Sequence, residues 1–512
     1  MPTVTVRKGS LCRVITVEIG TTLLSVIRKA GISVSFPCNG KGSCGKCKVK
    51  AIGDLSEFLE KESKWISPSE KEAGVRMACY TTVAGDCEIE VIERSTNAVV
   101  ENAYTAWEGK LDPLYPDGYG VAFDIGTTTV AAQLFSPAEK RPLSAKGELN
   151  RQQTYGADVI SRIVSCNTDT VEPQSLLIRR QLSEMIKDLC NGAGISFDEV
   201  RYLVVCGNTT MMYILCGIEP APLSVAPFTM AQPFGGLFDI DLPDFEHLPC
   251  WIPECASAYV GADITCSVLA SGMAHMSGNI LLVDAGTNGE MVLASGGGLL
   301  CCSTAAGPAF EGAGISCGGN ASSGAINSVE YRDGSFSYTT IGEQPADKLC
   351  GSGLIDAVAA LLNAGYITAK GKLKLPDGGD FFFGDSSVYL SQKDIRQIQL
   401  AKAAIRAGMD TLIHAAGLTY EEIETIILCG GFGSYLRPAS AEAIGLIPAG
   451  FSQKAIAIGN AAGNGAAQIL QSSARQQEAI QLVRSMSTVE LASSPYFHDQ
   501  YIAQMMFPVP AQ

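Results

Sequence analysis

Histidine is scarce in this sequence, and so are long apolar runs. Its 512 residues include only four dispersed histidines, too few and too far apart for a histidine-based metal site. No segment offers the roughly eighteen uninterrupted apolar residues of a membrane span, and the N-terminal residues alternate like a strand instead of forming the apolar core of a signal peptide. We therefore expect a cytoplasmic protein with no membrane partner.

Positive charge is also in deficit. The formal net charge is −15, and no Lys/Arg run interleaves with aromatic residues, so the chain is not built to neutralise nucleic-acid phosphates. We expect no nucleic-acid partner. Because 46% of the residues are hydrophobic and only 17% are charged, the chain can bury sizeable cores, and its length predicts about two to four domains.

Cysteine is plentiful, but eighteen cysteines scattered through a chain of this length do not indicate a disulfide scaffold. Four of them follow the plant-type 2Fe-2S ferredoxin spacing, with one extra residue in the first interval. The glycines of FPCNGKGSCGKCKV can take positive φ and bring backbone N–H groups close to an inorganic sulfide. The sequence therefore predicts a 2Fe-2S cluster in a reducing, anaerobic interior. The predicted ligands are Cys38, Cys44, Cys47 and Cys79.

Three alternative interpretations of this loop are less consistent with the residues. A structural zinc site usually has two Cys-x2-Cys pairs, and this segment has one. Gly40 to Lys46 imitates a P-loop, but Cys47 stands where the magnesium-binding Ser or Thr should be. Cys87 competes with Cys79 for the fourth ligand position, yet Cys87 alternates onto the same face as the apolar residues of CEIEVI. We therefore favour Cys79.

The first 93 residues predict a small domain. Strands at 3–8 and 12–19, a helix from Thr22, the cluster loop and later strands in KVKAIG and CEIEVIE resemble the β-grasp fold of 2Fe-2S ferredoxins. Residues 94–118 lose this pattern and predict a linker. If flexible, a linker of that length would reach about 25–30 Å, enough for the cluster domain to move between an electron donor and an acceptor.

One sequence pattern then occurs twice in the remaining chain. GVAFDIGTTTVAAQLF and NILLVDAGTNGEMVLAS each run an apolar strand into an aspartate and a Gly-Thr turn, and each is followed later by a strand ending in Cys-Gly. This is the internal repeat of a duplicated α/β domain. It predicts one subdomain over 119–275 and a second, with a C-terminal extension, over 276–512.

Two facing copies of this repeat would form a nucleotide cleft. Asp124 and Asp284 are the predicted catalytic residues, each orienting Mg²⁺ or its water, while the turns aim N–H and hydroxyl donors at phosphate oxygens. The glycines of CGGFGSYL would let the nucleoside lie against the backbone. The predicted nucleotide-binding residues are Gly126, Thr127, Thr128, Thr129, Asn208, Gly286, Thr287, Asn288, Gly289, Gly430 and Gly431.

The repeat is similar to the nucleotide-binding unit of the acetate and sugar kinase, heat-shock chaperone and actin superfamily. Together with the N-terminal domain, the chain resembles the ATP-dependent reductive activators of corrinoid proteins. The motifs that carry this resemblance nearly end to end are QQTYGADVISRI, GNTTM, YVGADI, AGPAFEGA, CGSGLIDAV and CGGFGSYL. The implied fold class is an α+β β-grasp ferredoxin domain followed by α/β duplicated RNase H-like, actin-like ATPase domains.

The resemblance implies one-electron reduction of an inactive cobalt(II) corrinoid to cobalt(I) for methyl transfer, driven by ATP. The implied cofactors are a 2Fe-2S cluster, ATP and Mg²⁺. The implied partners are a corrinoid protein of a methyltransferase system and an upstream low-potential electron donor, with a homodimer left open. Two rival functions stay open: an activator of another low-potential enzyme, such as a radical dehydratase, and a non-catalytic redox sensor with a nucleotide switch.

Three further stretches allow two interpretations each. Glu311 in AGPAFEGA either reaches the nucleotide cleft or lies in a tight connection of small residues. The helical stretch LSQKDIRQIQLAKAAIRAGMDTLIHAAG carries Lys and Arg residues that we assign to a solvated face and not to a ligand site. The tail FHDQYIAQMMFPVP is expected to dock on the body, the alternative being a corrinoid contact.

Overall fold

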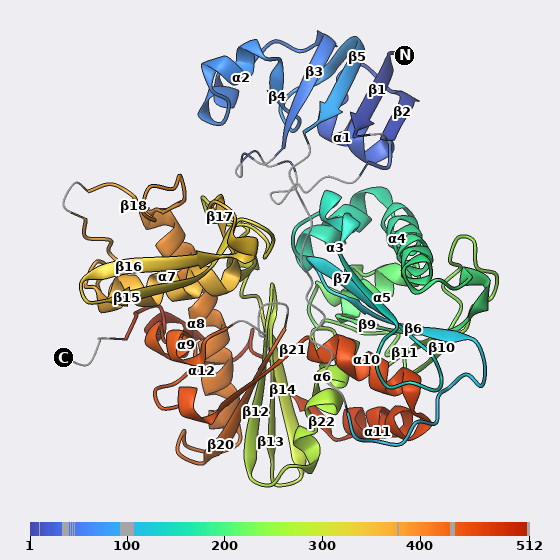
Figure 1. Ribbon diagram of the computed structural model, residues 1–512, viewed down its shortest axis with the longest axis vertical. Coiled ribbons are helices and arrows are strands. Elements are labelled where there is room, and N and C mark those ends of the chain that lie inside the picture. Colours follow the sequence, from blue (N-terminus) through green and yellow to red (C-terminus); the bar gives the residue numbers. More distant parts are fainter. Residues whose placement is uncertain are drawn as a thin grey trace. The chain divides into compact units, whose positions relative to one another are not determined.

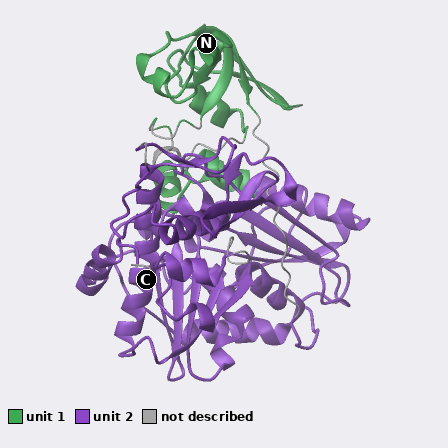
Figure 2. Ribbon diagram, turned by 60° about the vertical axis from the view of Figure 1, so that its left-hand side comes forward, with its two compact units in different colours: residues 1–96, 149–178 green, residues 97–148, 179–512 purple. Residues whose placement is uncertain are grey.

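The chain forms two compact units (Figure 2). The first comprises residues 1–96 and 149–178, and the second comprises residues 97–148 and 179–512. The computed structural model describes residues 1–9, 11–32, 40, 42, 45, 47–92, 107–375, 378–430 and 436–508. Within these ranges, no helix is both long and apolar enough to cross a lipid bilayer.

The first unit contains a five-stranded sheet with the order β2-β1-β5-β3-β4, in which only β1 and β5 pair in parallel. Its strands are β1 (Thr3–Lys8), β2 (Leu11–Thr16), β3 (Lys48–Leu55), β4 (Val75–Met77) and β5 (Val83–Val91). Helix α1 (Leu23–Lys29) begins at Thr22, whose side chain accepts a hydrogen bond from the Ser25 N–H at 3.2 Å. The apolar residues of α1 share one core with the sheet, as a ferredoxin-like β-grasp domain requires.

The second unit contains two six-stranded sheets with matching strand orders, drawn in Figure 1. In each, the first two strands pair antiparallel, with a third strand beside the second, and two later strands add in parallel at the first strand. The first sheet contains β6 (Tyr119–Ile125), β7 (Thr129–Phe135), β8 (Ser144–Leu149), β9 (Val200–Gly207), β10 (Gly236–Phe238) and β11 (Cys250–Ile252); the second contains β12 (Asn279–Ala285), β13 (Gly289–Ser295), β14 (Gly298–Thr304), β20 (Ile423–Cys429), β21 (Ala455–Gly459) and β22 (Met486–Thr488). The shared order β8-β7-β6-β9-β11 and β14-β13-β12-β20-β21 is the duplication that the sequence repeat predicts.

One helix pair of the second unit packs unusually closely. A Cβ added to Gly465 on α10 would lie 2.1 Å from the Cys266 oxygen on α6, so glycine is needed where these helices meet. The helices are α3 (Val159–Asp169), α4 (Glu172–Ala193), α5 (Thr209–Leu215), α6 (Ala262–Ser271), α7 (Gly351–Asn363), α8 (Gln392–Ala415), α9 (Pro438–Ala443), α10 (Ala461–Gln471), α11 (Ser473–Arg484) and α12 (Pro495–Ala503), besides α1 and the short α2 (Pro68–Glu72). The smaller strands are β15 (Ala325–Arg332), β16 (Ser335–Thr340), β17 (Lys348–Leu349), β18 (Phe381–Phe382) and β19 (Tyr389–Leu390).

Part of the predicted linker packs on the second unit. The residues up to Ala106 lie outside the described ranges, but from Trp107 onward the chain contacts the junction of α10 and α11. The Asp112 carboxylate accepts hydrogen bonds from Ser472, at 2.6 Å, and from Ser473. Trp107 and Asp112, both within the predicted 94–118 segment, are thus held against the second unit.

The prediction that the Lys and Arg residues of helix α8 lie on a solvated face is wrong for Lys402 and Arg406. Lys402 is fully buried, and burial, with a smaller contribution from Arg406, lowers the pKa of Lys402 to about 7. The Arg406 side chain is only 12% exposed and pairs with the buried Asp410 at 2.8 Å. The helical period in this stretch is right, whereas the exposure of its charges is not.

The C-terminal segment explains why Lys402 is buried. Its Nζ donates to the main-chain oxygens of Gln504 and Met506 at 2.6 Å each and lies 5.3 Å from the centre of the Phe507 ring. Helix α12 also packs along α8. The prediction that the tail docks on the body is therefore confirmed.

Candidate functional site

The described part of the cluster loop brings two of the predicted ligands together. Cys47 follows the loop and Cys79 follows β4, and their Sγ atoms are 3.3 Å apart. This separation is compatible with two thiolates that bind one iron–sulfur cluster. The other two predicted ligands, Cys38 and Cys44, lie outside the described residues.

The loop glycines have the backbone that the sequence predicts. Gly40, Gly42 and Gly45 have φ values of 80°, 71° and 68°, a region that other residues rarely adopt. An added Cβ would lie 2.8 Å from Leu24 at Gly40, and still closer to the Tyr80 and Trp65 side chains at the other two positions. These three described glycines, which we call the glycine cradle, pack closely against the domain, and their backbone fits a loop around a 2Fe-2S cluster.

A buried carboxylate fixes the segment that carries Cys79. Glu62 accepts hydrogen bonds from the Met77 N–H at 2.9 Å and from the Thr81 hydroxyl at 3.4 Å, and it pairs with Arg76 at 3.0 Å. Burial opposes ionisation of Glu62, but the bonds from Arg76 and from backbone N–H groups outweigh it and lower the pKa of Glu62. The ionised carboxylate thus holds the chain on both sides of Cys79.

Cys87, the competitor for the fourth ligand position, lies in the core of the β-grasp domain. It is buried on β5, where it pairs with Val4 and shares its face with Ile89 and Val91. Burial raises the pKa of the Cys87 thiol to about 11, which disfavours the thiolate that iron requires. This geometry supports Cys79 as the ligand.

A pair of serine variants tests this assignment. Cys79→Ser should lose most of the visible absorption and most of the iron and acid-labile sulfide of the purified protein, because one of four thiolates is replaced by a poor iron ligand. Cys87→Ser, the matched control, should keep both at wild-type levels. A coloured Cys79→Ser protein beside a colourless Cys87→Ser protein would reverse the assignment.

In the second unit, the two predicted catalytic aspartates occupy equivalent positions. Asp124 is the register partner of Cys206 in the parallel pair β6–β9, and Asp284 is the register partner of Cys429 in the parallel pair β12–β20. Both are therefore at the carboxyl ends of central strands, where α/β folds place ligands. The repeat thus gives each half one carboxylate at the same point of its sheet.

These carboxylates belong to a larger acidic group. Burial raises the pKa of Asp124 to about 7, and the nearby Asp284 adds to the rise; burial also raises the pKa of Asp284 to about 6. Asp263 and Glu290 share this environment. Burial, together with the neighbouring carboxylates, raises the pKa of Asp263 to about 8 and that of Glu290 well above its usual value. The group favours a bound cation.

Sequence reasoning missed Asp263 and Glu290. Asp263 lies in the first turn of α6, within the motif YVGADI, and Glu290 follows Gly289 at the start of β13. Glu290 directly follows Gly289, and Asp263 follows Gly261 with one residue between them, so the signal was a carboxylate close after a glycine of a motif. Among the described residues, no three His, Cys, Asp or Glu side chains converge closely enough to hold a metal ion by themselves.

The turn of the first half is built from several of the predicted nucleotide contacts. Asn208 caps α5 by accepting from the Met211 N–H at 3.0 Å, and it donates to the Thr127 hydroxyl at 3.1 Å. Gly126 allows the turn to close, since a Cβ there would lie 2.8 Å from the Thr129 oxygen. Asn208 therefore orients the turn, and Thr129 begins β7.

The turn of the second half is equally tight. The Gly286 N–H donates to the Asn288 oxygen at 3.0 Å, and a Cβ on Gly289 would lie 2.8 Å from the Ile405 side chain of α8. Gly430 has a φ of 102°, and a Cβ there would lie 2.4 Å from the Asp284 carboxylate. Glycine is thus needed where the Cys-Gly motif meets the predicted catalytic aspartate, while Gly431 lies outside the described residues.

Glu311 reaches both turns. Its carboxylate accepts hydrogen bonds from the Thr287 hydroxyl at 2.6 Å and from the Thr128 hydroxyl. Of the two interpretations that the sequence leaves open, the structure supports the one in which Glu311 reaches the turns predicted to bind the nucleotide.

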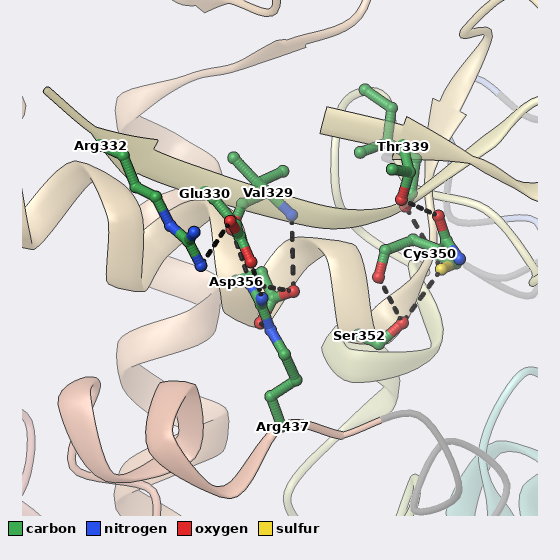
Figure 3. Close-up of polar contacts among 10 residues, drawn as sticks. Val329, Glu330, Arg332, Thr339, Cys350, Ser352, Asp356 and Arg437 are labelled. Carbon is green, nitrogen blue, oxygen red and sulfur yellow. Dashed lines mark hydrogen bonds and ion pairs between the residues drawn. The ribbon is translucent and has the colours of Figure 1, made fainter. Parts of the chain in front are cut away.

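Figure 3 shows how the chain is anchored where α9 begins, just beyond residues 431–435, which lie outside the described ranges. Arg437 forms ion pairs with Asp356 of α7 and Glu330 of β15, both at 2.7 Å, and donates to the Val329 oxygen at 2.8 Å. Asp356 is buried, so Arg437 also neutralises a carboxylate that would otherwise be costly to bury. The start of α9 is therefore fixed to α7 and β15.

Comparisons with known proteins agree with this geometry. Three family models match in succession: a 2Fe-2S iron-sulfur cluster binding domain over residues 9–84, the RACo middle region over 119–276, and the C-terminal domain of RACo, the ASKHA domain, over 278–511. Together with the observed sheets, they confirm the predicted fold class.

Relatives match over most of their lengths. The corrinoid activation enzyme RamQ of Eubacterium limosum is 33% identical, with 94% of this chain and 95% of that protein covered. The [Co(II) methylated amine-specific corrinoid protein] reductase of Methanosarcina barkeri is 25% identical over 76% of this chain and 77% of its own. A solved structure, the reductive activator for corrinoid,iron-sulfur protein, superposes with a TM-score of 0.73 at 29% identity and covers 98% of each chain. The chain therefore belongs to the family of reductive activators of corrinoid proteins, in which a 2Fe-2S domain is joined to an ASKHA nucleotide-binding domain.

Proposed function

We propose that this protein is an ATP-dependent reductase that transfers one electron from its 2Fe-2S cluster to the cobalt(II) of a corrinoid held by a partner protein, which returns the cobalt to the cobalt(I) state used in methyl transfer. The observation that carries the proposal is the near end-to-end match to RamQ. Because both the cluster domain and the nucleotide-binding domain lie within this match, the redox and ATP functions are proposed together.

The cluster domain supplies the electron. A plant-type 2Fe-2S centre provides one-electron chemistry at about −400 mV. Cys47 and Cys79, with Cys38 and Cys44, would hold it, and the glycine cradle would place backbone N–H groups beside it. Glu62 keeps the Cys79 segment in position.

The nucleotide domain supplies the driving force. The cobalt(II)/cobalt(I) couple of a corrinoid protein is expected to lie below the potential of the cluster, and each 59 mV of that gap opposes a one-electron transfer by about tenfold. Asp124 and Asp284 would orient magnesium or its water at the phosphates, while the turn hydroxyls and N–H groups contact phosphate oxygens. Nucleotide binding and hydrolysis would then favour a complex in which the cobalt is easier to reduce.

We assign the domains as 1–93 for the cluster, 94–118 for the linker, 119–275 for the first ATPase subdomain and 276–512 for the second with its C-terminal extension. We further propose a cytoplasmic location, an upstream low-potential electron donor and, as an option, a homodimer. The reducing environment that a sulfide cluster needs supports the location. The cluster must be re-reduced after each transfer, which supports the donor.

The experiment mixes chemically reduced protein with a cobalt(II) corrinoid protein from the same organism, with and without MgATP. MgATP should raise the yield of cobalt(I), read from the corrinoid absorption spectrum, by at least about tenfold, since 59 mV of gap corresponds to a factor of ten. Equal yields with and without nucleotide would contradict the ATP requirement. No reduction under either condition would favour a different low-potential target or a redox sensor.

A further inference from the structure

Glu311 connects the two copies of the repeat at the nucleotide cleft. It ends the short 3₁₀ helix η6 (Pro308–Glu311). Its carboxylate accepts from the hydroxyl of Thr128, in the first turn, and from that of Thr287, in the second. One side chain therefore contacts the same kind of donor in both halves of the duplicated fold.

The backbone that carries Glu311 is firmly held. Phe310 beside it is buried, and the Gly307 N–H donates to the Thr287 oxygen at 2.8 Å. Gly307 and Gly312, on either side of the helix, have φ values of 78° and 79°, and a Cβ on Gly312 would lie 2.4 Å from the backbone nitrogen of Gly319. Any adjustment at this point would therefore come from the Glu311 side chain and not from its backbone.

The chemistry of the two hydrogen bonds suggests what Glu311 does. A hydroxyl has one hydrogen to donate, and here the two turn hydroxyls donate to a carboxylate. A phosphate oxygen arriving at the same turns is also an anionic acceptor, so it must compete with Glu311 for these hydrogens, and the two anions repel each other.

We propose that Glu311 is a phosphate-competing residue. In the nucleotide-free protein it occupies the hydroxyl donors of both turns, and it gives them up when the phosphates of ATP bind. This inference rests on the proposed function, in which the two turns bind ATP phosphates. It adds that the affinity for ATP is set partly by a residue that opposes binding.

The test is Glu311→Gln, which keeps the shape of the side chain and removes its charge. MgATP and adenosine are each titrated against wild type and variant by calorimetry. The variant should bind MgATP about tenfold more tightly, the effect of weakening a charge-assisted hydrogen bond in the free protein. Adenosine affinity should be unchanged, because adenosine brings no phosphate to the turns. Glu311→Ala should behave like Glu311→Gln, with tighter MgATP binding and an unchanged affinity for adenosine.

The exposed Glu246 provides a matched control, since Glu246→Gln removes the same charge away from the turns and should leave both affinities unchanged. Unchanged or weaker MgATP binding by Glu311→Gln, with normal thermal unfolding, would overturn the inference. So would an equal gain for adenosine, which would mean that Glu311 acts on the fold of the cleft and not on phosphate. A wild-type protein that fails to bind MgATP would instead overturn the proposed function.

Discussion

The double variant Asp124→Asn, Asp284→Asn is expected to lose ATP hydrolysis by at least about a hundredfold, the usual scale for removing groups that stabilise charge at a reacting centre. Each aspartate lies at the carboxyl end of the first strand of its own half. Asparagine keeps the size of the side chain but removes the negative charge proposed to hold magnesium or its water. Phosphate release during turnover measures the effect, and each single variant should lose part of the activity.

Protein stability provides a control for this result. Because burial raises the pKa of Asp124 to about 7 and that of Asp284 to about 6, ionising them costs folding free energy. This cost is absent below the unfolded-state pKa of about 4 and grows as the pH rises through the folded-state values. At pH 8, without magnesium, the variant should therefore unfold at a temperature no lower than the wild type, and its iron–sulfur absorption should be intact.

The exposed Asp385 supplies a matched substitution, and Asp385→Asn should retain wild-type turnover. Undiminished hydrolysis in the double variant would mean that the cleft between the two turns is not the ATPase site. If the double variant unfolds at a clearly lower temperature than the wild type, its loss of hydrolysis would be explained by structural damage and not by the missing negative charges.

The sequence predicted most of what depends on local pattern. The loop glycines had to adopt positive φ if backbone N–H groups were to approach a sulfide, and Gly40, Gly42 and Gly45 do so. The alternation of apolar and polar residues in CEIEVI predicted that Cys87 lies in the core. The repeated strand and Gly-Thr turn predicted two sheets of one design, and the register of Asp124 and Asp284 follows from it.

The features that were missed depend on contacts between distant segments. Asp263 has the pattern of an ordinary residue in a first helical turn and Glu290 that of an ordinary strand residue, and only the closure of the second unit places both near Asp284. Lys402 is a charged residue within a helical pattern, and such a residue is expected to face solvent because buried lysine is rare. Its partners are main-chain oxygens about a hundred residues away, and side-chain patterning carries no information about such acceptors.

The final prediction concerns two variants, one that loses the electron source and one that loses the response to ATP. Cys47→Ser should bind MgATP like the wild type yet reduce no cobalt, since Cys47 is one of the proposed cluster ligands, with its sulfur 3.3 Å from that of Cys79. Asp124→Asn should keep a cluster that dithionite reduces normally but lose the gain in cobalt(I) that ATP produces. Corrinoid absorption, nucleotide titration and cluster bleaching measure the three properties on the same samples.

Cys12, which is exposed on β2, provides the matched control, and Cys12→Ser should behave as wild type in all three measurements.

Mixing the Cys47→Ser and Asp124→Asn proteins is informative as well. If the electron and the nucleotide must act from the same chain, the mixture stays inactive; recovery of ATP-dependent reduction would require the cluster of one chain to serve the nucleotide domain of another, as a homodimer would allow. Cobalt(I) formation by Cys47→Ser alone would contradict the cluster as the electron source, because its chain would lack one of the four thiolates that hold the iron.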